Sequence, residues 1–441
     1  MSITGTPLLW VLGVLAVGLP VLTVLAWSRL RGRRSVVVPA RWVMVVASQL
    51  AAVLLVGAAL NDYGYFFGSW SDLGSSVAQS LGQRPTVTPV TYRHGATVAP
   101  VRAAGVTGLP TRLTGQTRAR AAAKGGRLEH VHIQGASTQL GERGYVYLPP
   151  QYFQARYAHT RFPAVEVLGG YPSTNSVLVR RLAIQRVLAR AIAHHQARPM
   201  VLVMLRPIVT YPRDTECTNV PAGPQAETYY GQDVPAAISA AFRVRPAGWG
   251  IAGISTGGYC ATKLSLTYPA TFRAAVSMSG YYHSLQDHTT GNLWGGSSVL
   301  RNLNSPEWLM AHQPAPHVSL LLTSSRDEAG PYGYADTRRF LRLIHPPTQV
   351  STIIAAHGAH TFTTWAPNIP GALHWLSQQL GPGGGQAAGP GPVAVSTNVR
   401  APSSRSRQPR TLAGGLPPAA SVRSAGAPGH RGGHRPRRGA G

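Results

Sequence analysis

Two stretches without charged side chains, Leu8–Trp27 and Trp42–Leu60, lie near the N-terminus and constrain the fold most strongly. About twenty apolar residues, rising 1.5 Å each in a helix, span the hydrocarbon core of a bilayer. A helix satisfies its own backbone hydrogen bonds, which a bilayer requires of any single spanning segment. The two stretches therefore predict a transmembrane helical hairpin within residues 1–62, and Pro20 predicts a kink in its first helix.

The connection between these stretches predicts their orientation. It carries five arginines, Arg29, Arg31, Arg33, Arg34 and Arg41. Positive charge is retained in the cytoplasm, so we expect everything after residue 60 outside the plasma membrane. An interfacial aromatic group would follow, made of Tyr63, Tyr65, Phe66, Phe67 and Trp70. The alternative is a cleaved signal peptide, which needs positive charge before its apolar core, whereas Met1–Pro7 carries no charged side chain.

The formal charge of +27 is unevenly distributed. Residues 84–127 hold eight basic residues and no acid within a predicted linker, 63–128, and residues 381–441 hold nine arginines and no acid. The second segment, rich in Gly, Pro and Ala, is predicted to be disordered. Without interleaved aromatic residues or a nucleic-acid-binding motif, we expect no nucleic-acid partner, and at most weak attraction to anionic lipids or cell-wall polymers.

Residues 129–380 have the pattern of one α/β domain. Seven short apolar runs are predicted strands: 144–148, 164–168, 200–205, 249–254, 274–279, 318–323 and 350–355. Apolar residues recur at helical spacing from Val177 to Ile192, and Asp233 is placed to cap a helix that ends at Phe242. Alternating strands and helices indicate a mostly parallel sheet with helices on both faces.

The most specific motif is Gly253-Ile254-Ser255-Thr256-Gly257. It follows a predicted strand and precedes a helical segment from Tyr259 to Tyr268, which is the context of a strained turn that exposes a nucleophilic serine. The flanking residues of so tight a turn must be small. We therefore predict Ser255 as a nucleophile; the alternative is a glycine-rich turn that binds an anion at a helix N-terminus.

A serine nucleophile needs a histidine base and a carboxylate that orients it, in the chain order serine, acid, histidine. Asp327 and Glu328 follow the run 318–323, and Asp327 is preferred because it comes first after the strand. His357 and His360 follow the last run, and His360 is preferred because His357 lies nearer the strand. No histidine has metal-ligand spacing with nearby acids, so no metal site is expected.

An oxyanion formed on the attacked carbonyl needs two backbone N–H donors. One is expected from Thr256, the residue after the nucleophile. The other is expected in the turn Leu168-Gly169-Gly170-Tyr171-Pro172, from Tyr171 or alternatively Gly170. This turn could instead simply end a strand.

Several motifs in this order resemble one family. They are Tyr145-Val146-Tyr147-Leu148-Pro149-Pro150-Gln151-Tyr152, the Gly169-Gly170-Tyr171-Pro172 turn, the serine motif, Ser279-Gly280-Tyr281-Tyr282 and His360-Thr361-Phe362-Thr363-Thr364-Trp365. The chain resembles the esterase family of α/β-hydrolases, which includes feruloyl and siderophore esterases and bacterial mycolyltransferases, and with its hairpin it resembles a membrane-anchored bacterial branch.

The resemblance implies an α/β-hydrolase fold and ester chemistry through an acyl-Ser255 intermediate, without a cofactor. The substrate would be an acyl ester, and a lipid or sugar alcohol could accept the acyl group. Many members have histidine where this chain has Leu168, which leaves the second oxyanion donor open. Mycolyltransferases often draw the acid from a later segment, where this chain offers Asp336 as a third candidate.

The two cysteines suit an extracytoplasmic compartment. Cys217 and Cys260 follow two predicted strands whose C-terminal ends should meet, so we expect a disulfide, worth about 3–4 kcal/mol; the alternative is two unpaired buried thiols. The bridge would hold the loop that carries Tyr211, Asp214 and Glu216 over the site, which makes these three candidate pocket residues. The sequence thus predicts a membrane-anchored serine esterase or acyltransferase, with a catalytically silent domain that binds anionic cell-envelope polymers as the alternative.

Overall fold

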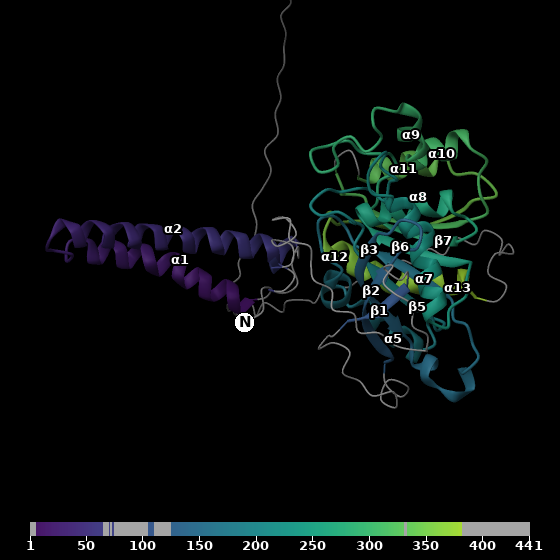
Figure 1. Ribbon diagram of the computed structural model, residues 1–441, viewed down its shortest axis with the longest axis horizontal. Coiled ribbons are helices and arrows are strands. Elements are labelled where there is room, and N and C mark those ends of the chain that lie inside the picture. Colours follow the sequence, from purple (N-terminus) through teal and green to yellow (C-terminus); the bar gives the residue numbers. More distant parts are fainter. Residues whose placement is uncertain are drawn as a thin grey trace, which may run out of the picture. The chain divides into compact units, whose positions relative to one another are not determined.

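The computed structural model describes residues 6–64, 70, 73–74, 105–109, 125–329 and 333–381 (Figure 1). The predicted interfacial residues Tyr65, Phe66 and Phe67 lie outside this range. Most of the predicted linker lies outside it as well, and so does the predicted disordered tail after Gly381.

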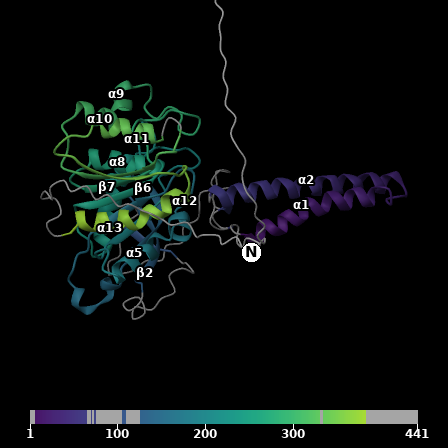
Figure 2. The same cartoon turned by 180° about the vertical axis from the view of Figure 1, so that it is seen from behind.

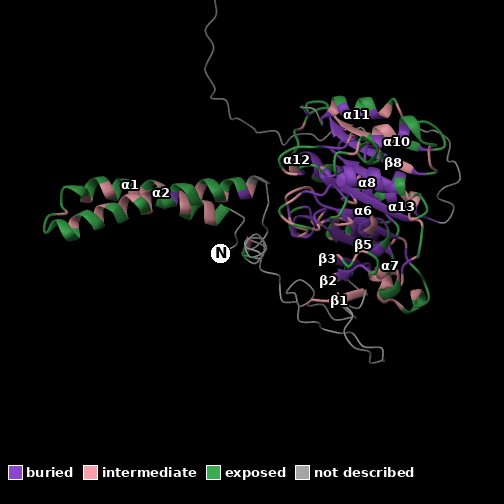
Figure 3. Cartoon of the chain, turned by 45° about the horizontal axis from the view of Figure 1, so that its top comes forward, coloured by how far each residue is buried: buried purple, intermediate pink, exposed green. Residues whose placement is uncertain are grey.

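Two long helices form from the predicted apolar stretches. They are α1 (Thr6–Trp27) and α2 (Arg34–Gly64). The helices pack against each other: Thr23 and Ser48 share a hydrogen bond of 3.3 Å between side chains, and Arg41 donates to the carbonyl of Trp27. Their outward side chains are mostly exposed and apolar (Figure 3). By length and composition, both helices could cross a membrane.

Nine strands in the rest of the described chain form one sheet, in the order β1-β2-β3-β5-β4-β6-β7-β8-β9. The strands are β1 (Gly105–Gly108), β2 (Arg127–Gln134), β3 (Gly141–Leu148), β4 (Ala164–Leu168), β5 (Val201–Leu205), β6 (Trp249–Ile254), β7 (Phe272–Met278), β8 (Ser319–Ser325) and β9 (Gln349–Ala355). The pairs β1–β2, β2–β3 and β3–β5 are antiparallel, and the other pairs are parallel. The sheet is therefore mostly parallel, as predicted.

Helices cover both faces of the sheet (Figures 1 and 2). On one face lie α7 (Val234–Ala241), α8 (Thr256–Thr267), α10 (Pro306–His312) and α11 (Tyr334–Leu341). On the other lie α5 (Ile184–Ala193), α12 (Phe362–Trp365) and α13 (Ile369–Gln379). Successive strand residues alternate between the two cores: Val165 and Val167 pack with α5 and α13, whereas Ala164 and Leu168 pack with α8. A parallel sheet needs this double cover because both of its faces are apolar.

Two short helices and several single turns complete the described elements. They are α6 (Ala226–Thr228), α9 (Ser298–Leu303), the 3-10 turns Pro150–Phe153, Ala155–Tyr157 and Ala366–Asn368, and the π turns Val177–Arg181 and Tyr229–Asp233. The helix predicted over 177–192 is interrupted, because Ala183 adopts a left-handed conformation (φ 49°) between the first π turn and α5.

The predicted capping role of Asp233 is wrong. Asp233 directly precedes α7, but its carboxylate makes no capping hydrogen bond to that helix. It instead accepts hydrogen bonds from the N–H groups of Ser137 and Thr138 and from the Thr138 hydroxyl, at 2.7–3.0 Å. The π turn before α7 continues the helical backbone through Asp233, so the side chain is free to fix the distant loop between β2 and β3.

Candidate active site

The serine motif forms a tight turn between β6 and α8. Ser255 has φ 57° and ψ −122°, a strained conformation for a residue with a side chain. A side chain at Gly253 would come within 2.0 Å of the Gly257 carbonyl, and one at Gly257 within 2.3 Å of the Gly169 carbonyl. Any larger residue at these two positions would overlap the backbone, so both must be glycine. The turn holds Ser255 at the C-terminal end of β6.

Three side chains from separate strand ends meet at Ser255. The Ser255 Oγ lies 2.9 Å from His360 Nε2, and His360 Nδ1 lies 2.6 Å from Glu328 Oε1. Ser255 follows β6, Glu328 follows β8 and His360 follows β9. Parallel strands bring their C-terminal ends to one edge, so residues far apart in sequence converge there.

The structure corrects the preference for Asp327 as the partner of His360. The Asp327 carboxylate lies 2.9 Å from His357 Nδ1, and both of these side chains are exposed, at 54% and 88%. The Glu328 side chain is 2% exposed and contacts His360 instead. Asp336, the third candidate, accepts the Tyr282 N–H and pairs with Arg339. The alternative acid, Glu328, is therefore the one that the fold brings to His360.

Glu328 is held by two further hydroxyl groups. Its Oε2 accepts from Ser279 at 3.0 Å and from Ser324 at 2.9 Å. Burial raises the pKa of Glu328, but the hydrogen bonds from His360, Ser324 and Ser279 outweigh burial and hold its pKa below the ordinary value. The side chain is consequently an oriented carboxylate that faces His360.

The predicted oxyanion residues lie beside the nucleophile. Thr256 is the first residue of α8, so its N–H has no acceptor within the helix. A side chain at Gly170 would come within 3.2 Å of the Ser255 Cβ, which places the turn after β4 against the serine. Tyr171 lines the same cavity as Ser255, and its hydroxyl donates to the Pro212 carbonyl at 2.9 Å.

A cavity of about 300 Å³ opens over Ser255 and His360. Besides these two it is lined by Tyr171, Asp214, Glu216, Thr256, Tyr281, Leu285, Asp287, Thr289, Thr290, Glu328 and Ala329. Two of the three predicted pocket residues, Asp214 and Glu216, are among them, and Tyr211 is not. The sequence reasoning missed the segment 285–290. Its only signal was position, because it follows β7 at the same sheet edge.

Asp214 and Glu216 are buried behind Thr256. Asp214 accepts from the Thr256 hydroxyl at 3.3 Å, and Tyr281 donates to Glu216. Burial raises the pKa of Asp214 to about 6. Burial and the charge of Asp214 raise the pKa of Glu216 to about 8. At neutral pH we therefore expect Asp214 to be mostly ionised and Glu216 mostly protonated.

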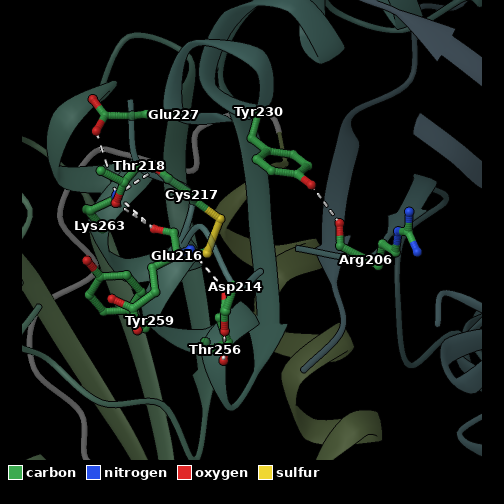
Figure 4. Close-up of a disulfide and its surroundings, with 12 residues drawn as sticks. Arg206, Asp214, Glu216, Cys217, Thr218, Glu227, Tyr230, Thr256, Tyr259 and Lys263 are labelled. Carbon is green, nitrogen blue, oxygen red and sulfur yellow. Dashed lines mark hydrogen bonds and ion pairs between the residues drawn. A yellow bond between two sulfur atoms is a disulfide. The ribbon is translucent and has the colours of Figure 1, made fainter. Parts of the chain in front are cut away.

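The predicted disulfide is present and joins this loop to α8. Cys217 and Cys260 are bonded, with their Cα atoms 5.8 Å apart (Figure 4). Next to the bridge, Lys263 is fully buried and donates to the carbonyls of Glu216 and Cys217, at 3.0 and 2.7 Å. The disulfide and the two hydrogen bonds from Lys263 thus connect the loop that carries Asp214 and Glu216 to α8, the helix that begins directly after Ser255.

One group among the described residues offers metal-ligand atoms close together. Atoms of His283, Glu307 and Asp336 lie within 4.8 Å of one another. Arg339 donates to Glu307 at 2.8 Å and also pairs with Asp336. Because Arg339 already pairs with both carboxylates, we assign no ion to the group.

Comparison with known proteins gives one family and several relatives. A family model described as "Putative esterase" matches residues 137–376. An uncharacterized protein of Corynebacterium glutamicum is 20% identical over 249 residues, which cover 54% of this chain and 57% of that relative. The chain thus matches little more than half the length of that relative.

Among solved structures, S-formylglutathione hydrolase from Agrobacterium tumefaciens is 17% identical, with a TM-score of 0.50. The match covers 58% of this chain and 96% of the hydrolase. A ferulic acid esterase is also 17% identical, with a TM-score of 0.47, over 57% of this chain and 97% of the esterase. The first likeness shows the α/β-hydrolase fold. Because the family match covers more than half of the sequence, the chain belongs to this esterase family.

Proposed function

We propose that the protein is a membrane-anchored serine esterase or acyltransferase in which Ser255 is the nucleophile, His360 the base and Glu328 the acid that orients it. One observation carries the proposal. The Ser255 Oγ, the His360 ring and the Glu328 carboxylate form a continuous chain of hydrogen bonds of 2.9 and 2.6 Å over an open cavity. This arrangement can remove the serine proton during attack on an ester.

The reaction follows from the positions of these atoms. Ser255 Oγ attacks the ester carbonyl carbon while its proton passes to His360 Nε2. The resulting oxyanion accepts a hydrogen bond from the N–H of Thr256. It accepts a second one from the N–H of Tyr171 or Gly170, in the turn after β4. The tetrahedral centre then collapses: His360 returns the proton to the departing alcohol, and the acyl group stays on Ser255. Water or an alcohol, deprotonated by His360, next attacks the acyl carbon. The bond to Ser255 Oγ breaks, His360 returns the proton to that oxygen, and an acid or a new ester is released.

The alternative, a catalytically silent domain that binds anionic cell-envelope polymers, does not require Ser255 and His360 to meet. The 2.9 Å hydrogen bond between them, 105 residues apart in the chain, favours the enzyme.

A fluorophosphonate probe tests the nucleophile directly. We expect the probe to label the wild-type protein in cell membranes and to leave Ser255→Ala unlabelled, because phosphonylation requires an activated serine hydroxyl. Ser239→Ala, which changes a serine on α7, is a matched control and should label normally. Equal labelling of wild type and Ser255→Ala would refute the nucleophile.

We also propose that the helices α1 and α2 anchor the protein with the nine-stranded sheet and its covering helices outside the plasma membrane. Five arginines occupy the connection between the helices and the start of α2, which favours a cytoplasmic connection. An epitope placed at the C-terminus should then be removed by protease added to intact spheroplasts, while a cytoplasmic marker survives. Digestion only after permeabilisation would reverse the orientation, and a soluble mature form would indicate a cleaved signal instead.

A further inference from the structure

The cavity over Ser255 has a charge opposite to that of the whole chain. The chain has 41 lysines and arginines against 14 acids, yet no lysine or arginine is among the described residues that line this cavity. Four acids do line it: Asp214, Glu216, Asp287 and Glu328. Carboxylates that gather in a cleft with low-dielectric walls concentrate a negative potential inside it.

Two of these acids are not accounted for by the proposed reaction and are ionised at neutral pH. Asp287 lies on the exposed loop after β7, and hydrogen bonds from Thr289 and Thr290 hold its pKa below the ordinary value despite partial burial. Asp214 is 3% exposed. One of its oxygens accepts a hydrogen bond from the N–H of Glu216, and the other accepts one from the Thr256 hydroxyl. A carboxylate has about four acceptor positions, so Asp214 can accept further hydrogen bonds from a ligand in the cavity.

One buried cation, Lys263, acts on Asp214 and Glu216 and lowers the pKa of each, but by less than burial raises it. The Lys263 ammonium group lies 3.7 Å from Glu227 and donates to loop carbonyls, and it is not a lining residue. The charges of Asp214 and Asp287 also act on Tyr171, another residue that lines the cavity. Burial raises the pKa of Tyr171, and the charges of Asp214 and Asp287 raise it further.

We propose that Asp214 and Asp287 make the catalytic cavity selective for esters that carry a positively charged ammonium group near the scissile bond. The inference rests on the proposed function and names its substrate class. Asp214 accepts a hydrogen bond from the hydroxyl of Thr256, the residue after the nucleophile. A cation held by Asp214 would therefore lie close to the acyl group on Ser255. Asp287, nearer solvent, would attract the cation to the cavity.

Two thioesters of nearly equal shape provide the test. S-acetylthiocholine carries a trimethylammonium group, and S-neohexyl thioacetate has carbon in place of that nitrogen. With the full-length protein in detergent at low ionic strength, we expect kcat/KM to be about tenfold higher for the cationic ester, the size of effect that screened carboxylates produce. The ratio of the two kcat/KM values cancels any change that affects both substrates equally.

Variants assign the selectivity to residues. Asp214→Asn should reduce the ratio to about twofold or less, and Asp287→Asn should reduce it less, because an exposed charge is screened more strongly. Asp327→Asn, which changes an exposed acid outside the cavity lining, is the matched control and should leave the ratio unchanged. Added salt should lower the wild-type ratio.

The ratio of kcat/KM for the cationic thioester to that for the neutral one should rise with pH. Asp214 gains its charge as pH rises through about 6, so the wild-type ratio should be higher at pH 8 than at pH 5. Ionisation of Glu216 near pH 8 acts in the same direction, and Asp287 is ionised throughout this range. In Asp214→Asn most of the rise should disappear.

A binding measurement decides the case in which neither thioester is turned over. Choline should protect Ser255 from the fluorophosphonate probe at a lower concentration than neohexyl alcohol, its uncharged isostere. Equal protection, equal kcat/KM for the two thioesters, or a ratio that survives both Asn substitutions would overturn the inference while the esterase stands. Absence of both turnover and Ser255 labelling would instead overturn the proposed function, and this inference with it.

Discussion

Glu328→Gln is expected to lower kcat for ester hydrolysis about ten-thousand-fold, whereas Asp327→Asn should leave kcat within about twofold of wild type. The amide keeps the shape of the carboxylate, but it can neither stabilise a positively charged His360 nor fix the ring with its Nδ1 proton toward position 328. Among the described residues Asp327 pairs with the exposed His357, and exposed pairs contribute little. Initial rates with para-nitrophenyl acetate measure both effects.

The comparison needs evidence that both variants are folded, because Glu328 is buried and holds Ser279 and Ser324. Unchanged melting temperatures would show that the loss of rate is chemical. The reverse pattern, with Asp327→Asn inactive and Glu328→Gln active, would show that the loop rearranges in solution and that Asp327 is the acid.

This pair of residues shows why the sequence could not identify the acid. The run taken as the strand ends at Thr323, but β8 continues to Ser325, so both acids lie in the turn that follows it. Adjacent residues in a turn point in different directions, and here one enters the core while the other faces solvent. Hydrophobic patterning locates a strand end to within about two residues, whereas the choice between neighbours depends on the turn.

Most strands of the sheet could be predicted because hydrophobic patterning locates them. All seven predicted strands are present. Strands β4 to β8 are almost wholly buried and read as continuous apolar runs. The edge strand β9 is exposed or only partly buried, but it still contains Val350, Ile353 and Ile354. Strands β1 and β2 were missed. Residues of β2 are only partly buried at several positions, and its sequence mixes Arg127, Glu129 and two histidines with apolar residues. β2 therefore lacks the continuous apolar run on which the prediction depended.

The cysteine pair was predicted from compartment and topology, and its contribution can be measured. Removing the Cys217–Cys260 bridge is expected to lower the free energy of unfolding by about 3–4 kcal/mol, because the bridge closes a loop with a sequence separation of 43 in the unfolded chain. For a domain of this size, the melting temperature should fall by roughly 10 °C. Thermal unfolding of the full-length protein in detergent, with and without a reductant, measures the change.

Activity should fall with stability, since the bridge also holds a loop that lines the cavity. Glu216 and Cys217 have φ values of 46° and 49°, and successive left-handed residues with side chains persist only when their surroundings impose them. Here the surroundings are the disulfide and the two hydrogen bonds from Lys263. Without the bridge, the loop can relax and move Asp214 away from Thr256. Ester turnover measured well below the melting temperature should therefore drop several-fold on reduction.

The double variant Cys217→Ala/Cys260→Ala separates the cross-link from other effects of the reductant. It should have the lower melting temperature already and should not respond to reductant, whereas the wild type should. Reduction keeps both sulfur atoms in the core, so a loss of stability common to reduced wild type and double variant must come from the missing bond. If reduced wild type keeps its melting temperature and activity, packing around Lys263 alone holds the loop, and the bridge has no measurable role at this site.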